Sequence, residues 1–324
     1  MRIKFLKKHW SNSAHNVFTD LCEFNGQLFC CFREARNHVS DDGVIRIINL
    51  DDNGTILSSS ALRIGQIDCR DPKLSVTPEG KLVMLAYGRN VSLINGPPAS
   101  QSLCWLSSDG LSWSGHHRLA DKNGWLWRVR WHQDKAYGFA YNRGQNALNL
   151  FCGDPRRSFH ILKKDAFSLA THGKGYPNES DLAFTSQGTA YALIRRDADS
   201  YSAQLGVSKA PYKHWQFKDL GFYLGGPVML LQSDHRAILA GRILVNDLFR
   251  TAVLKMDLVT GRTEVELLLP SAGDNSYPGL QVRDNNLYLS YYCSHQEKKV
   301  VSTWPVLVWM SERFRLPISL PRYN

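Results

Sequence analysis

The sequence predicts an all-β fold, a six-bladed β-propeller built from four-stranded antiparallel blades. Two observations predict it: one strand–turn–strand unit recurs six times, and the turns of these units are evenly spaced along 324 residues. The turns fall near positions 26, 80, 134, 188, 235 and 285, with spacings of 54, 54, 54, 47 and 50 residues, close to 324/6 = 54. Because about fifty residues hold four short strands, each unit has the size of one propeller blade.

Each unit consists of a short apolar strand, a polar turn and a second strand in which apolar and polar residues alternate, a pattern typical of half-buried strands. Gly, Asn or Asp at the turns supplies the positive φ of tight hairpins. The six units, in chain order, are 20–33, 74–89, 129–141, 182–195, 229–242 and 280–292. Closing them into a ring leaves no long exposed sheet edge. We therefore expect one domain over residues 1–324, with a β-sandwich of coincidental spacing as the alternative.

The composition is that of a globular protein, with 43% hydrophobic and 21% charged residues, which excludes disordered, collagen-like and disulfide-scaffold classes. The net charge of +10 favours a polyanionic partner, such as nucleic acid, acidic polysaccharide or a membrane surface, without choosing among them. Basic and aromatic residues do not combine into a nucleic-acid-binding motif, so no nucleic-acid partner is predicted.

The N-terminus is basic and lacks the apolar core of a secretory signal, and no apolar stretch is long enough to span a membrane. The seven cysteines have no Cys-x-x-Cys spacing, and no cluster has metal-ligand spacing, so neither a metal nor a cofactor is predicted. Adjacent Cys30 and Cys31 in an apolar run suit a reducing compartment. We expect a cytoplasmic protein, with secretion after removal of a leader as the alternative.

One position in each unit is expected to face the mouth of the central channel. It lies three residues before the central apolar residue of the first strand, at the start of the innermost strand of the blade. Asp71, Glu179 and Tyr277 occupy it in units two, four and six, whereas Phe18 and Leu126 occupy it in units one and three. Alternate blades therefore present two carboxylates and a phenol at one level.

A second position, seven to eight residues after the turn, carries Arg33, Arg195 and Arg242 in units one, four and five. The residues before each of them are mainly apolar, and an unpaired buried charge is expensive. Arg195 is preferred to Arg196 because of the strand register. Three converging arginines exceed the need of the few local carboxylates, so we expect them to bind a ligand carboxylate, which guanidinium matches as a two-pronged donor.

The first of these residues resemble a motif of the exo-sialidases and the wider sialidase-like six-bladed propellers. Arg33 follows Phe, as in the Phe-Arg motif of the first sialidase blade, and Asp71 resembles the acid/base aspartate that comes next. The motif continues with Glu34-Ala rather than the Ile-Pro common in bacterial sialidases. The Asp-box repeats of the family are nearly absent, and 107–113 is one shortened copy.

The later residues continue the resemblance in the same order. Glu179 lies 16 residues before Arg195, as expected for the glutamate and the second arginine of the family. Arg242 resembles the third arginine, and Tyr277, 35 residues further on, resembles the tyrosine nucleophile. The resemblance covers all six functional positions.

The resemblance implies a retaining exo-glycosidase that releases a terminal sialic acid, or a related 2-keto sugar acid, from an acidic glycan. It implies that Tyr277 attacks the sugar with Glu179 as base, and that Asp71 protonates the leaving oxygen. It also implies that the three arginines hold the sugar carboxylate. Two alternatives remain open: a polysaccharide lyase, for which His38 and His172 are further candidate bases, and a propeller that binds glycans or proteins without catalysis.

Overall fold

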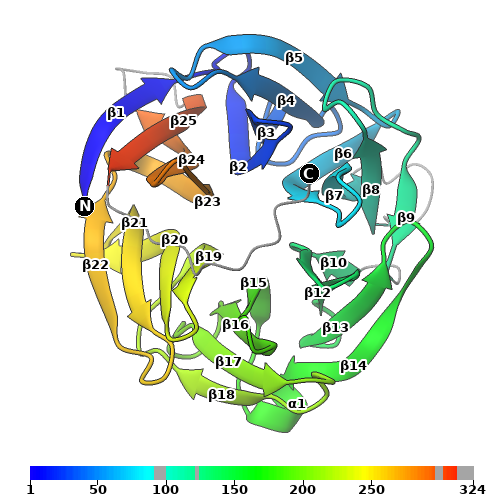
Figure 1. Cartoon of the computed structure of the whole chain (residues 1–324), viewed down its shortest axis with the longest axis vertical. Helices are drawn as coiled ribbons and strands as arrows, with labels where there is room; N and C mark the ends of the chain where they lie inside the picture. Colours follow the sequence, from blue (N-terminus) through cyan, green and yellow to red (C-terminus); the bar gives the residue numbers. More distant parts are fainter. Residues whose placement is uncertain (91–99, 121–123, 296–301, 312–324) are drawn as a thin grey trace.

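The computed structural model describes residues 1–90, 100–120, 124–295 and 302–311. Antiparallel sheets stand around a central channel like the blades of a propeller (Figure 1). The predicted all-β propeller is therefore confirmed. In the described residues, the helical exception is the one-turn helix α1 (Leu169–His172).

Each blade is a four-stranded antiparallel unit, and in blades 1 to 5 the strand numbers increase from the channel outwards (Figure 1). Blades 1 and 2 contain β2 (His15–Phe24), β3 (Gln27–Ala35), β4 (Val44–Leu50) and β5 (Ile56–Leu62), then β6 (Ile67–Val76), β7 (Leu82–Asn90), β8 (Gln101–Ser107) and β9 (His117–Leu119). In blade 3 the inner strand is split into β10 (Gly124–Leu126) and β11 (Arg130–His132), followed by β12 (Lys135–Asn142), β13 (Ala147–Asp154) and β14 (Ser158–Ser168).

Blades 4 and 5 repeat the same order. They contain β15 (Pro177–Phe184), β16 (Thr189–Arg196), β17 (Gln204–Lys209) and β18 (Gln216–Asp219), then β19 (Gly225–Ser233), β20 (Arg236–Val245), β21 (Leu248–Asp257) and β22 (Thr263–Leu268). Blade 6 contains β23 (Ala272–Arg283), β24 (Asn286–His295), β25 (Ser302–Ser311) and, on the outside, β1 (Arg2–Lys8).

Hydrogen bonding joins the first and last blades. A single parallel pair, His15 with Thr303, links β2 to β25, so blades 6 and 1 form one continuous eight-stranded sheet while the other four blades remain separate. The structure thus contains five hydrogen-bonded sheets but six four-stranded units. The N-terminal strand β1 pairs antiparallel with β25, for example Leu6 with Val308, and completes the last blade.

The cores lie between neighbouring blades, so strands such as β16 are buried on both faces and are not half-buried as the alternating pattern predicts. In β16, Ile194 is buried in a cluster shared with blade 3, and the preceding Leu193 is buried in a cluster shared with blade 5. Successive side chains of a strand point to opposite faces of its sheet. A strand buried on both faces therefore packs two neighbours at once, which explains the nearly continuous apolar run of this strand.

A ring of buried charges lies on the inner strands. Arg128 donates from Nη1 to both Asp20 oxygens at 2.8 Å, and its Nε lies 3.7 Å from Asp181. The carboxylate of Asp20 also accepts from the backbone N–H of Leu74 in the next blade, and Asp181 accepts from that of Met229. These charges are paired and hydrogen-bonded across blades, as buried charges must be.

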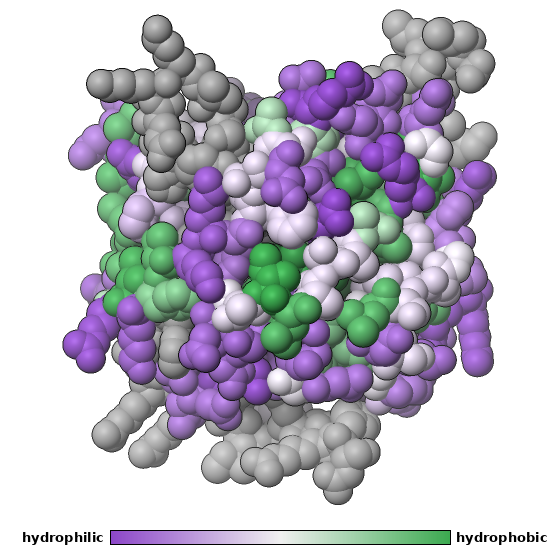
Figure 2. Space-filling view, turned by 90° about the horizontal axis from the view of Figure 1, so that it is seen from above, coloured by the Kyte–Doolittle hydropathy of each residue, from purple (hydrophilic) through white to green (hydrophobic). Residues whose placement is uncertain are grey.

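The periphery of the ring is mixed in character. Figure 2 shows one side of it, where apolar residues form several small areas separated by hydrophilic ones. The shortened Asp-box forms a turn, in which the carboxylate of Asp109 accepts from the backbone N–H groups of Leu111 and Ser112 at 2.8 Å. Across the described ranges, no helix combines the length and apolarity that crossing a bilayer requires.

Candidate functional site

Bulges in the inner strands set the position of the candidate site. In the inner strands of five blades the ladder register shifts in the first half of the strand, and the residues skipped at these shifts include Phe18, Asp71, Glu179, Gly226 and Tyr277. Phe18, Asp71 and Tyr277 have left-handed backbone conformations, with φ of 63°, 48° and 49°. Because bulges re-aim side chains and such strained positions cluster at functional sites, the equivalent positions on different blades can meet.

Tyr277, Glu179 and Arg195 form one hydrogen-bonded group although they come from different strands. The hydroxyl of Tyr277 donates to Oε1 of Glu179. Arg195 donates from Nη1 to both oxygens of Glu179 at 2.7 and 2.6 Å, and the same nitrogen lies 3.4 Å from the Tyr277 hydroxyl. The backbone N–H of Gly226 donates to Oε2 of Glu179 at 2.9 Å. The structure thus brings Tyr277 and Glu179 together as the sequence predicts, and it adds Arg195, which the sequence assigned to a ligand carboxylate, as a partner of Glu179.

The charges of this group favour a neutral phenol beside an ionised carboxylate. Burial opposes ionisation of Glu179, but Arg195, the Tyr277 hydroxyl and the Gly226 N–H outweigh it, so the pKa of Glu179 lies below its usual value. Burial, and then the charge of Glu179, raise the pKa of Tyr277 well above its usual value. The phenol therefore keeps its proton at rest and has a ready acceptor for it.

Gly226 leaves space for the phenol. It occupies the blade 5 position equivalent to Asp71, Glu179 and Tyr277, with φ of 57°. A Cβ at Gly226 would lie 3.2 Å from both Cα and Cγ of Tyr277. A larger residue would therefore press on the ring whose hydroxyl contacts Glu179, so the absent side chain is itself part of the site.

Gly226→Ala is expected to lower kcat at least tenfold and to cost about 1–2 kcal/mol of unfolding free energy, the cost of a left-handed non-glycine residue. Gly221→Ala is the matched control, because Gly221 has φ of 74° and nothing lies within 4 Å of the position that its Cβ would take. Both variants should lose similar stability in urea titrations, whereas kcat should fall only for Gly226→Ala. Equal kcat losses in the two would show that backbone strain, not the contact with Tyr277, is responsible.

Asp71 is a buried acid with an unpaired oxygen. Its residue is 4% exposed, and within the described part of the chain Oδ1 has no hydrogen-bond partner. Burial raises the pKa of Asp71 to about 6, against the opposing effects of Arg70 and Lys73. The ammonium of Lys73 lies 6.0 Å from the centre of the Tyr277 ring. A carboxyl group with this pKa holds a proton in mildly acidic solution and can donate it.

Arg33 is fully buried and already has internal partners. Its Nε donates to Asp68 Oδ1 at 2.7 Å, and its Nη1 donates to the Asn37 carbonyl at 2.9 Å and contacts His15 Nδ1 at 3.1 Å. Its Nη2 reaches the Ser40 hydroxyl at 3.4 Å. Each guanidinium nitrogen of Arg33 is therefore occupied from within the protein.

The three predicted arginines do not form the expected unpaired cluster, because each of them is already paired with a carboxylate. Arg33 pairs with Asp68, Arg195 with Glu179 and also with Asp197, and Arg242 with Asp274 at 3.0 Å. Apart from Glu179, these carboxylates lie outside the two repeated positions, so the repeat gave no sign of them. Among the described residues, several buried side-chain atoms have no hydrogen-bond partner. They include Arg70 Nε, Asp71 Oδ1 and Arg242 Nε.

Arg70 belongs to the site although it was not predicted from the sequence. Its Nη1 donates to Asp68 Oδ2 at 3.0 Å, so Asp68 bridges Arg33 and Arg70. Its guanidinium lies 5.1 Å from the centre of the Phe18 ring. The available signal was its place directly before Asp71, at the last regular pair before the bulge. Arg70 thus brings a second positive charge to the side of the candidate acid.

His15, His38 and Asp274 also gather near Arg33, with potential metal-ligand atoms within 4.8 Å of one another. Their spacing along the chain gave no sign of this. However, Arg33 donates to His15, and Asp274 is paired with Arg242. Burial and then Arg33 lower the pKa of His15 to about 3. These positive charges oppose a cation at this place.

His172, the other histidine predicted as a candidate base, lies at the helix α1. His172 ends α1, where its Nδ1 accepts from the backbone N–H of Ser168 at 3.2 Å and its ring stacks on Phe167 with centroids 4.7 Å apart. Its contacts are those of a helix-end residue packed on a core aromatic ring. The structure therefore does not bring His172 to the group around Tyr277.

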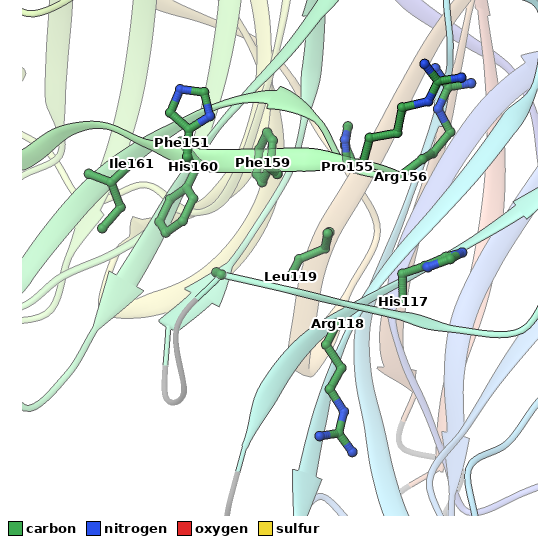
Figure 3. Close-up of a pocket in the computed structure, with 11 residues that line it drawn as sticks. His117, Arg118, Leu119, Phe151, Pro155, Arg156, Phe159, His160 and Ile161 are labelled. Carbon is green, nitrogen blue, oxygen red and sulfur yellow. The ribbon is translucent and has the colours of Figure 1, made fainter.

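A cavity of about 590 Å³ is also separate from the predicted site residues. It lies between β9 and β14 at the outer edges of blades 2 and 3, where Leu119, Phe151 and Phe159 line it (Figure 3). A smaller cavity adjoins the candidate site and is lined by Lys73, Trp127, Glu179, Gly226 and Tyr277 among others. Of these two cavities, the second is the one connected with the chemistry described above.

The chain is similar to solved propeller structures over nearly its full length. A protein of unknown function from Dyadobacter fermentans aligns with a TM-score of 0.77 at 18% identity, covering 95% of this chain and 98% of that one. Trypanosoma rangeli sialidase aligns with a TM-score of 0.67 at 11% identity over 92% of this chain and 55% of its own, so this chain spans about half its length. Penicillium chrysogenum alpha-L-arabinanase aligns with a TM-score of 0.65 at 12% identity over 91% and 93%.

No protein-family model matches the sequence, and no curated protein matches it either. At identities between 11% and 18%, the likeness to solved structures shows the fold alone, a β-propeller. Two of the three similar structures are glycoside hydrolases by their descriptions. The chemistry of this chain has to be argued from its own residues.

Proposed function

We propose that this protein is a retaining exo-glycosidase that removes a terminal sialic acid, or a related 2-keto sugar acid, from an acidic glycan. The observation that carries the proposal is the contact of the Tyr277 hydroxyl with Glu179, which Arg195 holds through both oxygens. A phenol in contact with an ionised carboxylate is the arrangement of an activated nucleophile. The anomeric carbon of a 2-keto sugar acid bears its own carboxylate, which repels a carboxylate nucleophile but not a neutral phenol.

In the first step, the Tyr277 oxygen attacks the anomeric carbon and its proton passes to Glu179. The glycosidic bond breaks, and the leaving oxygen takes the proton of Asp71. In the second step, the Asp71 carboxylate takes a proton from water, the water oxygen attacks the anomeric carbon, and the Tyr277 oxygen leaves and recovers its proton from Glu179. Two displacements at one carbon give retention of configuration.

The guanidinium groups have different tasks in this proposal. Arg195 and Arg242 are part-exposed, so they remain accessible to the sugar carboxylate. Arg242 Nε and Arg70 Nε are buried and have no hydrogen bond in the described residues, so each guanidinium keeps one unused donor beside the site. Arg33 is closed off by its own partners, so we assign it a positioning role: through Asp68 it fixes Arg70 beside Asp71.

Assays of the wild-type protein with fluorogenic and natural glycosides of several 2-keto sugar acids distinguish a hydrolase from a lyase and from a non-catalytic propeller. The expected product is the free sugar acid, released first with the anomeric configuration of the substrate, as followed by proton NMR. Release of the inverted anomer would contradict the mechanism. An unsaturated product absorbing in the ultraviolet would favour the lyase, and binding without turnover would favour a glycan-binding propeller.

The rate on a substrate with a poor leaving group is expected to fall as the pH rises through about 6. The sign follows from the pKa of Asp71, which burial raises to about 6, so that the proton needed by the leaving oxygen is present below this pH and absent above it. The low pKa of Glu179 keeps that base ionised throughout this range. The pH dependence of kcat/KM measures the effect, and Asp71→Asn should abolish this limb together with most of the activity. A limb that persists in Asp71→Asn would belong to another group.

A further inference from the structure

The hairpin of blade 5 is apolar and exposed beside the candidate site. Strands β20 and β21 pair as far as Val245 with Leu248, and the hairpin turns at 246–247. Leu244, Leu248 and Phe249 are 51%, 55% and 46% exposed. Three large apolar side chains so exposed at one hairpin cost free energy in water, so a function must be sought for them.

The strand pairing divides this hairpin into two faces. Leu244 lies directly opposite Phe249, and Val245 lies opposite Leu248. Because side chains alternate along a strand, Leu244 lies on the same face as Arg242, two residues earlier. Val245 belongs to the other face and packs on the apolar cluster between blades 4 and 5. We call the exposed pair Leu244 and Phe249 the apolar wall.

Aromatic and cationic contacts connect the apolar wall to the candidate site. The guanidinium of Arg242 lies 4.9 Å from the centre of the Phe249 ring. Phe249 lies 5.5 Å from Tyr223, over whose ring the guanidinium of Arg195 lies at 5.4 Å. The backbone carbonyl of Phe249 accepts from the buried side chain of Asn275 at 3.1 Å, which anchors the hairpin to blade 6. The wall is therefore continuous with the two part-exposed arginines.

The wall also rises beyond the level of those arginines. Leu244 lies two residues further along the strand than Arg242, which is about 7 Å in an extended chain. In an exo-glycosidase the charged sugar fills the bottom of the pocket, at the arginines, and the rest of the substrate extends outwards past the mouth. A group at the height of the wall thus belongs to the leaving portion of the substrate.

We infer that Leu244 and Phe249 form a leaving-group subsite that binds an apolar aglycone, such as an aryl group. This rests on the proposed function, because the wall acquires its meaning from the sugar-acid site beside it. The wall selects among glycosides of the same sugar acid by what is attached to it. Burial of the aglycone against the wall removes the apolar surface of both partners from water.

Two glycosides of one sugar acid, with a methyl and with a 4-methylumbelliferyl aglycone, test this inference. For the aryl glycoside, Leu244→Ser should raise KM about fivefold to tenfold, the effect of losing about 50 Å² of apolar contact. For the methyl glycoside, KM should stay within about twofold. For the aryl glycoside, KM should rise less in Phe249→Leu, which keeps an apolar side chain, than in Phe249→Ser. Leu248→Ser is the matched control on the opposite face and should alter neither KM.

The same pair of ligands, titrated calorimetrically into Tyr277→Phe protein, separates the two proposals. Binding of both glycosides, with the aryl preference lost in the double variant Tyr277→Phe/Leu244→Ser, supports the subsite. If Leu244→Ser weakens the binding of both glycosides equally, or weakens neither, the subsite is overturned and the proposed function stays intact. If wild type cleaves neither glycoside and Tyr277→Phe protein binds neither, the proposed function fails, and the subsite fails with it.

Discussion

Tyr277→Phe protein is expected to lose at least about a thousandfold in kcat while keeping its fold, because the proposed covalent bond forms through the missing oxygen. The ring, with its centroid 4.8 Å from that of Phe18, remains in place, and Glu179 keeps Arg195 and the Gly226 N–H as donors. Initial rates give the loss in kcat, and thermal unfolding gives the stability. Wild type, but not the variant, should also show a sugar-acid mass increase on the peptide that carries Tyr277.

Tyr292→Phe is the matched control for this experiment. Tyr292 is a second buried tyrosine of the site, its ring centroid is 6.0 Å from that of Tyr277, and its hydroxyl contacts Asp274 at 3.0 Å. Loss of this hydroxyl removes one hydrogen bond but no nucleophile, so kcat should fall less than about tenfold. If turnover survives in Tyr277→Phe but is lost in Tyr292→Phe, the nucleophile is Tyr292 and the assignment to Tyr277 is wrong.

Arg128→Ala is expected to lower the free energy of unfolding by about 3–5 kcal/mol, the range for removing one partner of a buried ion pair. Its side chain is 5% exposed and is bonded to both oxygens of Asp20, whose side chain is 0% exposed. The substitution leaves Asp20 charged and buried, with the N–H of Leu74 as its remaining partner. Urea unfolding followed by tryptophan fluorescence measures the loss.

Two further variants show whether the uncompensated charge is the cause. Replacing both charges, as in Asp20→Asn/Arg128→Met, should recover most of the stability, because no buried charge is left unpaired. Arg262→Ala should have a much smaller effect, since the Arg262–Glu264 pair is 79% and 60% exposed and is screened by water. A double variant as unstable as Arg128→Ala would point instead to lost packing of the long arginine side chain.

The fold was predictable because its signal repeats. A turn that contains glycine, asparagine or aspartate, between two largely apolar strands, occurs six times, so chance agreement at one unit matters little. The position that carries Asp71, Glu179 and Tyr277 was predictable for the same reason: a bulge at a constant distance from the apolar centre of the strand keeps the equivalent residues in step.

The rest of the site could not be predicted from the repeat because its partners are irregular. Asp68 reaches Arg33 from the neighbouring blade, and Asp274 reaches Arg242 from the start of β23, so no common spacing relates these carboxylates to the arginines. Gly226 did stand in the repeated position, but its contribution is the absence of a side chain beside Tyr277, which becomes visible only when the neighbouring blade is in place.

The pairing of Leu6 with Val308 has a consequence for biosynthesis. These residues are 308 − 6 = 302 positions apart, yet they lie side by side in the sheet that seals the ring. On the ribosome, β1 cannot pair with β25 until the residues that separate the two strands have been translated, so this seam of the ring stays open over that interval. Chaperone dependence of expression should therefore concentrate at this seam rather than at the hairpins, which can pair as soon as they emerge.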